Sequence, residues 1–266
     1  MPAISVIIPV FNAESYISET LESVINQTFK DIEIICVDDG SSDNSLKILE
    51  EYKLKDNRIK VISQNNSWVV VARNNAIKNA EGEYIYPLDS DDIIDSTLLE
   101  KEYAAISSGK GDIITCNVQI FGKESYEMYL PKPSKLNMSC HNCLVNAALF
   151  RKDLFDRAGG YDPSFSKGLE DYDLWLNLIF NHGAKIYRIP EILFFYRQKN
   201  LNESRNEQQI KFYYDNLIRK LHCKYREMKK YKRLRKILNY IYQVKDKKDR
   251  IIIRLFKITV YSVKRK

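Results

Sequence analysis

Short apolar runs alternate with segments of helical spacing along the first 90 residues of the chain. Residues 3–10 and 32–37 form apolar runs of the length expected for buried strands. Between them, over residues 15–27, apolar side chains recur every three or four positions, which predicts an amphipathic helix. The same alternation predicts a helix over 44–52, a strand over 58–63, a helix over 69–79 and a strand over 83–88.

This order of elements predicts an α/β fold with a mostly parallel sheet that helices cover on both faces. In open sheets of this kind, ligands bind beyond the carboxyl ends of the strands. Polar clusters follow three of the expected strands, at residues 9–12, 38–42 and 89–92. We therefore expect three strand ends to form one crevice.

Three carboxylates follow the expected strand over 83–88, at Asp89, Asp91 and Asp92. Buried Asp is rarely unpaired, and Mg²⁺ or Mn²⁺ prefers oxygen ligands while keeping positions open for phosphates. The pattern therefore favours a site for a metal ion and a diphosphate. The alternative is a polar turn that caps a helix beginning near Ser96, because Asp and Ser are favoured at helix N-termini.

Charge is distributed unevenly along the 266 residues. Residues 205–266 hold 21 of the 42 Lys and Arg but only 5 of the 35 Asp and Glu, so this basic extension carries +16 and residues 1–204 carry −9. Helical spacing over 207–242 and a basic stripe over 250–264 predict a helical, amphipathic extension, suited to an anionic membrane surface. The alternative is that its apolar side packs on the body. Nucleic acid is not expected as a partner, because no nucleic-acid-binding motif accompanies the charge.

Two further features bear on the compartment. No uncharged apolar run reaches about 18 residues and the N-terminus lacks signal-peptide features, which predicts a cytoplasmic protein, peripheral on the inner face of the cytoplasmic membrane. Five cysteines, an odd number, predict reduced thiols. The alternative is a zinc site formed by three of these cysteines, Cys140, Cys143 and Cys223, together with His222.

Six motifs together resemble those of glycosyltransferase family 2, whose members are inverting enzymes with the GT-A fold. The resemblance covers about residues 3–200. It implies a GT-A domain over 1–204, with a Rossmann-like sheet, followed by the extension. The motifs are SVIIPVFN (5–12), SVINQT (23–28), VDDGSSD (37–43), ARN (72–74), DSD (89–91) and GLEDYDLW (168–175).

The resemblance implies a nucleotide-sugar site with a metal cofactor. Phe11 would stack on the base, Asp39 would accept a hydrogen bond from it, and Arg73 would reach the base and diphosphate. The residues implied for nucleotide-sugar binding are Pro9, Phe11, Asn12, Asp39, Arg73, Asp89 and Ser90, and those implied for Mn²⁺ or Mg²⁺ are Asp91 and Asp89.

A second acidic pair, Glu170 and Asp171, precedes apolar residues at helical spacing. The simplest interpretation is charge at a helix N-terminus, where the helix dipole favours acids. The resemblance implies instead that Asp171 is the general base, which takes the proton from an acceptor hydroxyl as that oxygen attacks the sugar.

Two positions depart from the usual family pattern. Trp68 stands in a segment, ahead of Ala-Arg-Asn, that is small or contains glycine in many members, so it could reshape the base and ribose pocket. After Arg197 many members have a histidine that closes the diphosphate site, whereas Gln198 and Lys199 follow here. Either Arg197 or Lys199 could supply the positive charge instead.

The function implied is metal-dependent transfer of a sugar, most consistent with a UDP-sugar donor, to a glycan or lipid-linked acceptor in bacterial surface-polysaccharide synthesis. One alternative is a family member that binds the nucleotide sugar without turnover. Another is a sugar nucleotidyltransferase. Those enzymes typically have a basic, glycine-rich loop after the first strand, and residues 9–14 contain no Gly and no Lys.

Overall fold

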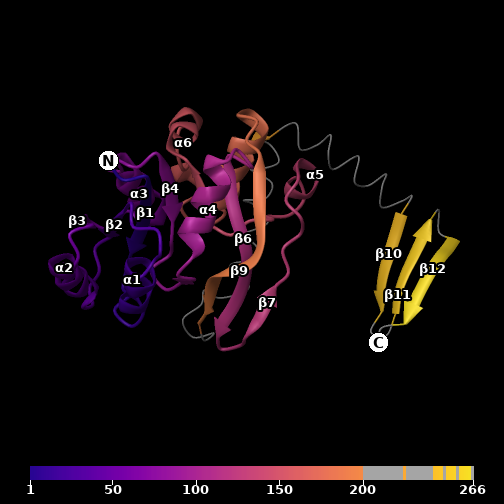
Figure 1. Cartoon of the computed structure of the whole chain (residues 1–266), viewed down its shortest axis with the longest axis horizontal. Helices are drawn as coiled ribbons and strands as arrows, with labels where there is room; N and C mark the ends of the chain where they lie inside the picture. Colours follow the sequence, from indigo (N-terminus) through magenta and orange to yellow (C-terminus); the bar gives the residue numbers. More distant parts are fainter. Residues whose placement is uncertain (200–223, 226–241, 248–249, 256–257, 265–266) are drawn as a thin grey trace.

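A computed structural model describes residues 1–199, 224–225, 242–247, 250–255 and 258–264 (Figure 1). Among these residues the largest element is a nine-stranded sheet, in which eight strands follow the order β3-β2-β1-β4-β8-β6-β9-β5 and β7 pairs with β6. The strands are β1 Ile4–Val10, β2 Ile32–Asp38, β3 Ile59–Ser63, β4 Tyr84–Pro87, β5 Ile93–Ile94, β6 Ile113–Gly122, β7 Tyr126–Met128, β8 Leu149–Arg151 and β9 Ile186–Gln198. The helices are α1 Ile17–Ile25, α2 Ser45–Lys55, α3 Trp68–Lys78, α4 Leu98–Ser107, α5 Lys135–Met138, α6 Lys152–Ala158 and α7 Glu170–Leu176, with a 3₁₀ turn at Pro163–Phe165 and a π-helical turn at Asn177–Asn181.

The first four strands pair in parallel, and the later ones do not all do so. β1 lies between β2 and β4, and β2 pairs with β3, all in parallel. β8 runs antiparallel to both β4 and β6, while β9 is parallel to β6. The strand–helix alternation expected over the first 90 residues is confirmed, and the helices expected over 15–27 and 69–79 are α1 and α3.

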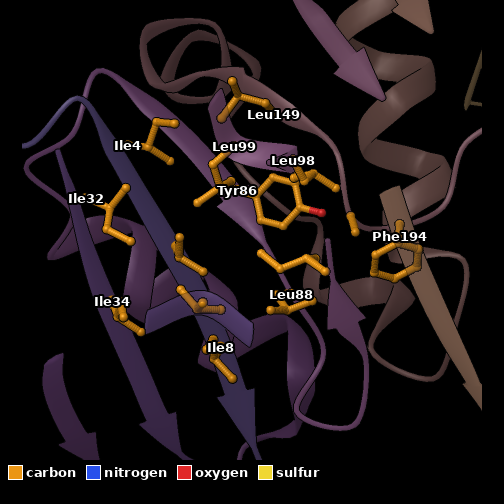
Figure 2. Packing of buried hydrophobic residues seen from close by; sticks show 14 of the residues in the cluster. Ile4, Ile8, Ile32, Ile34, Tyr86, Leu88, Leu98, Leu99, Leu149 and Phe194 are labelled. Atoms are coloured by element: carbon orange, nitrogen blue, oxygen red, sulfur yellow. The ribbon is translucent and has the colours of Figure 1, made fainter. Parts of the chain in front are cut away.

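Strands β1, β2 and β4 are buried along their whole length because helices cover both faces of this part of the sheet. All seven residues of β1 are buried, and Ile4, Val6 and Ile8 face one cluster of side chains while Ile7 faces another. Figure 2 shows the first cluster, with Leu98 and the following Leu99 of α4 beside side chains from β1, β2 and β4. Helices α1, α2 and α4 contribute to this cluster, and α3, α6 and α7 contribute to the other.

The parallel order brings three strand ends to one edge of the sheet. The backbone N–H of Asp39, which follows β2, donates to the carbonyl oxygen of Val10 at the end of β1 (2.8 Å). The N–H of Leu88, which follows β4, donates to the carbonyl oxygen of Ile7 (2.9 Å). These two hydrogen bonds tie the segments after β2 and β4 to β1, at the edge where the crevice is expected.

The helix expected over 250–264 is wrong for the residues described there. They form the strands β11 Arg250–Leu255 and β12 Ile258–Lys264, which join β10 Tyr242–Lys247 in a separate three-stranded antiparallel sheet (Figure 1). The stretch contains Ile251, Ile252 and Ile253 in succession, and residues branched at Cβ favour strands over helices. The helix expected over 207–242 lies almost wholly outside the described residues.

Lys224 and Tyr225, within the basic extension, contact the body of the protein. Tyr225 is buried in the same apolar cluster as the side chains of α7. In the described part of the chain, no helix has the length and apolar character needed to span a bilayer.

Candidate functional site

A cavity of about 720 Å³ lies at the carboxyl ends of β1, β2 and β4. Trp68, Glu170 and Lys199 also contribute to its wall. Asn12 and Asp171 are not among the residues that line it. Of the residues predicted to bind donor or metal, those that line it are Pro9, Phe11, Asp39, Arg73, Asp89, Ser90 and Asp91.

Asn12 and Asp39 hold the loops at one end of the cavity. The Asn12 side-chain oxygen accepts a hydrogen bond from the backbone N–H of Ser42 (2.8 Å), which joins the loops after β1 and β2. One carboxylate oxygen of Asp39, Oδ1, accepts from Gln64 Nε2 (2.7 Å) and from the backbone N–H of Ser67 (2.8 Å). Asp39 therefore fixes the turn before α3 and lines the cavity at the same time.

Arg73 joins the two acidic motifs across the cavity wall. Its Nη2 lies 2.6 Å from Asp89 Oδ1, and its Nη1 lies 2.8 Å from Glu170 Oε1. The side chain is almost fully buried against the ring of Tyr161. Burial would lower the pKa of Arg73, but Asp89, Tyr161 and Glu170 raise it above its ordinary value, so the guanidinium stays charged. Both terminal nitrogens are thus engaged by carboxylates of the protein.

Asp91 provides the carboxylate best suited to a metal ion. It lines the cavity, and its Oδ2 lies 2.8 Å from Lys199 Nζ. In the described residues, no cluster of three or more His, Cys, Asp or Glu side chains forms a metal cage. Oxygen ligands from one or two carboxylates, with phosphates completing the shell, are the usual set for Mg²⁺. The donor set of Asp91 and Asp89 fits such an ion.

Asp92, which follows the 89–91 motif, and Arg197 of β9 contact each other and other residues of the protein. Asp92 is buried, and its Oδ1 accepts from the backbone N–H of Arg197 in β9 (2.8 Å). Burial, with the nearby charges of Asp89 and Asp91, raises the pKa of Asp92 well above its ordinary value. Arg197 pairs with Glu19 of α1, so Lys199 is the cation that lines the cavity after β9.

Asp171 lies in the first turn of α7. The residue before it, Glu170, lines the cavity. Burial raises the pKa of Asp171 to about 7, and the charge of Glu170 adds to the rise. The backbone N–H of Tyr172, the charge of Arg73 and the side chain of Asn142 oppose it. A carboxylate with this pKa can accept a proton near neutral pH and release it again.

Asn142 and Asn146, in the loop before β8, contact the two acidic motifs. Asn142 Nδ2 donates to Asp171 Oδ2 (3.0 Å), and Asn146 Nδ2 donates to Asp89 Oδ1 (3.3 Å). Neither contact was predicted from the sequence. Asn142 lies in the Cys140–Cys143 segment, for which the sequence favoured reduced thiols, with a zinc site as the alternative. Cys143 Sγ instead donates to the carbonyl oxygen of His141 (3.5 Å), and the other two candidate zinc ligands lie outside the described residues.

The basic extension touches α7 two residues beyond Asp171. Tyr225 Oη donates to Asp173 Oδ1 (2.9 Å), and Lys224 Nζ lies 2.8 Å from Asp173 Oδ2 and 2.9 Å from Asp162 Oδ2. Asp173 is buried, so an unpaired charge there would be costly. These contacts hold the helix that carries Asp171.

Residues 5–165 match the model of the family described as glycosyl transferase family 2. A relative from Bacillus subtilis, the uncharacterized glycosyltransferase EpsJ, is 32% identical over 216 residues, which are 74% of this chain and 62% of that protein. The poly(ribitol-phosphate) beta-glucosyltransferase of Bacillus spizizenii is 48% identical over 114 residues, 41% of this chain and 18% of that protein.

A solved structure of similar shape is that of S. aureus TarS, residues 1–349, in complex with UDP-GlcNAc. The TM-score is 0.66 at 25% sequence identity, and the match covers 77% of this chain and 62% of that one. This chain thus spans a little under two thirds of the length of EpsJ and of the TarS chain.

Proposed function

The chain belongs to glycosyl transferase family 2, and from that premise we propose that it transfers a sugar from a UDP-sugar to a hydroxyl group with inversion at the anomeric carbon. The family and the GT-A fold expected from the motifs are both confirmed. A nucleotide-sugar donor agrees with the UDP and UDP-GlcNAc complexes of TarS. Inversion, the metal and the particular donor are parts of the proposal.

The observation that carries this proposal is the pair of bonds made by Arg73. Asp89, at the end of β4, and Glu170, at the start of α7, share one guanidinium. The carboxylates proposed for the donor diphosphate therefore lie close to Asp171, the proposed base. A single displacement needs that closeness, because the acceptor oxygen must attack the sugar carbon while the diphosphate leaves from the opposite face.

In the proposed reaction, Asp171 takes the proton of the acceptor hydroxyl as the oxygen bonds to the anomeric carbon. The bond from that carbon to the phosphate oxygen breaks, and its electron pair remains on the nucleoside diphosphate. Asn142 Nδ2 donates to Oδ2 of Asp171 and so holds the carboxylate in position. Lys199, paired with Asp91 at the cavity wall, can move its charge toward the departing phosphates.

Asp91, with Asp89, would hold a divalent cation on the donor side. When bound there, Mn²⁺ or Mg²⁺ supplies Lewis-acid stabilisation of the leaving diphosphate. Their oxygen ligands suit hard cations of this kind.

We also propose a lipid-linked or glycan acceptor presented at an anionic membrane. The support is the +16 charge of residues 205–266, because each basic residue near such a surface contributes about 1 kcal/mol. The full chain should sediment with vesicles that contain anionic lipid at low salt, and should be released as salt rises. Binding that is equal on neutral vesicles would remove this part of the proposal.

The test of the enzymatic proposal needs no known acceptor. UDP-sugars, with GDP-mannose and dTDP-rhamnose as outliers, are screened by thermal shift and by slow hydrolysis in the presence of Mn²⁺. We expect at least one UDP-sugar to stabilise the protein and to be hydrolysed. Stabilisation without hydrolysis or transfer would identify a binding protein without turnover, and no stabilisation by any nucleotide sugar would contradict the proposal.

A further inference from the structure

Trp68 has a backbone conformation that a bulky side chain rarely adopts. It begins α3 with a φ of +73°, in the left-handed region that favours glycine. Among the described non-glycine residues, only Asn12 and Leu169 share a positive φ, and Asn tolerates it better than most residues. The conformation is unfavourable for Trp68, so something else in the protein must hold it.

The turn before α3 imposes this conformation. Asp39 Oδ1 accepts hydrogen bonds from Gln64 and from the backbone N–H of Ser67, the residue before Trp68. Gly40, the residue after Asp39, approaches the same turn so closely that a Cβ there would lie 2.8 Å from the backbone N of Asn66. The backbone at Trp68 is therefore fixed by its neighbours and not by its own side chain.

Burial does not compensate for the strain. Trp68 is 50% exposed, whereas Trp175 is completely buried in the core. A tryptophan that only filled space would be expected inside, and a residue chosen only for this backbone would be glycine. Strain that is kept at an exposed residue points to a role for its side chain.

The indole ring lines the cavity at the end marked by Asp39. Phe11, 51% exposed, lines the same cavity, so two large, exposed aromatic side chains line it. Glu170 and Asp91 mark the parts of the wall nearest the reacting groups. Because Asp39 bonds directly to the residue before Trp68, the ring belongs to the end where a nucleobase would meet a carboxylate acceptor.

We propose that Trp68 is a donor-binding residue that adds a second aromatic face, beside Phe11, for the nucleobase of the donor. The inference rests on the proposed function, since it assumes a nucleotide in this cavity. Aromatic rings stack on bases without needing a particular hydrogen-bond pattern. The strained backbone at the start of α3 keeps this ring at the cavity when no donor is bound.

The chain provides its own optical probe for the test. It has two tryptophans, and Trp175→Phe leaves Trp68 as the single indole. In this variant, with Mg²⁺ present, we expect UDP and UMP to quench and shift the indole emission, and pyrophosphate to leave it unchanged. Unchanged emission on UDP binding would contradict stacking, and a change that needs the attached sugar would place the ring at the sugar instead.

Two substitutions separate the ring from the strain. Trp68→Ala removes the ring and keeps a side chain in the left-handed conformation, whereas Trp68→Gly removes both. We expect the two variants to lose UDP affinity alike, by about tenfold or more, while Trp68→Phe retains most of it. Without ligand, Trp68→Gly should melt about 2–4 °C higher than Trp68→Ala, because glycine removes the strain and alanine keeps it.

Calorimetric titration of the wild-type protein with UDP distinguishes the possible failures. If the wild type binds UDP and Trp68→Ala binds it equally well, the role of Trp68 is refuted and the proposed function stands. If the wild type binds no nucleotide, both fail. If both variants lose affinity and the indole emission responds to the base, the second aromatic face is established.

Discussion

The two sides of the cavity hold their carboxylates in different ways. On the donor side, Asp39 directly follows β2 and Asp89 comes two residues after β4, so the buried parallel strands fix the positions of both. On the side of α7, Glu170 and Asp171 stand on a helix of seven residues, and their partners are distant in sequence. Glu170 pairs with Arg73, and Asp171 accepts from Asn142.

This difference predicts a separation of roles. Substitutions on the donor side should weaken nucleotide-sugar and metal binding, because those residues line the cavity proposed for the donor. Substitutions around α7 should change turnover while donor binding stays close to normal. The comparison would be contradicted by a donor-side substitution that changes turnover alone, or by a substitution around α7 that changes donor binding alone.

The largest effect is expected at Asp91. If this carboxylate holds the cation that stabilises the leaving diphosphate, Asp91→Asn should lower the rate of transfer or hydrolysis by about 10³-fold or more. EDTA should have the same effect on the wild-type protein, reversed by added Mn²⁺. The matched control is Asp31→Asn, at an exposed aspartate outside the cavity. Full activity after complete metal removal would refute the role.

Asp171→Asn should give the next largest effect. Without a base the turnover should fall by roughly 100-fold or more, while the dissociation constant for the UDP-sugar stays near the wild-type value. Kinetics and calorimetry on the same preparation give both numbers. A variant that loses donor affinity alone would place the base elsewhere.

Stability provides the control for this variant. The native pKa of Asp171, about 7, lies above its unfolded value of about 3.9, so the native state binds the proton more tightly. The contribution of this group to stability is therefore present below pH 4 and is lost as pH rises toward 7. Asp171→Asn should be at least as stable as the wild type at pH 8, so unfolding cannot explain its lost turnover.

Asn142→Ala should produce a smaller, pH-dependent effect. The amide donates to Asp171 and favours its charged form, so its loss should raise the pKa of that carboxyl. The acid limb of the rate profile should move up by about one pH unit, which lowers the rate about tenfold at pH 6. An equal loss at every pH would indicate that Asn142 acts only on the loop structure.

Tyr225→Phe should have the smallest effect of the four. It removes the hydroxyl that donates to Asp173, while Lys224 still pairs with that carboxylate. One lost hydrogen bond of about 1 kcal/mol should lower the melting temperature by about 2–4 °C and reduce turnover a few-fold, without a change in donor affinity. Unchanged stability and turnover would show that the basic extension does not support α7.

The same difference between the two sides explains what the sequence could reveal. Asp39, Asp89 and Asp91 could be predicted because Asp39 follows one apolar strand, β2, and the other two follow another, β4. The alternation of strands and helices predicted that these strand ends lie together. The role of Asp171 came from the motif resemblance. Nothing local to Asn142 indicates its contact with a carboxylate 29 residues away.

One expectation was wrong for a local reason. The spacing of basic residues over 250–264 suggested a helix, but the run of residues branched at Cβ forms strands, so local propensity outweighed the charge pattern. The ion pairs of Arg73 with Asp89 and Glu170 were not predicted either, because the partners lie 16 and 97 residues away in the sequence. Contacts of this kind depend on the tertiary fold.

The pH dependence of kcat/KM for the UDP-sugar tests the central claim most directly, because that claim assigns proton removal to Asp171. Burial and the charge of Glu170 raise the pKa of Asp171 to about 7, and a base must be deprotonated to act. The rate should therefore rise with pH through a limb near 7, and the residual activity of Asp171→Asn should lack this limb. A wild-type profile that is flat from pH 5 to 9, or a limb that persists in Asp171→Asn, would contradict the account.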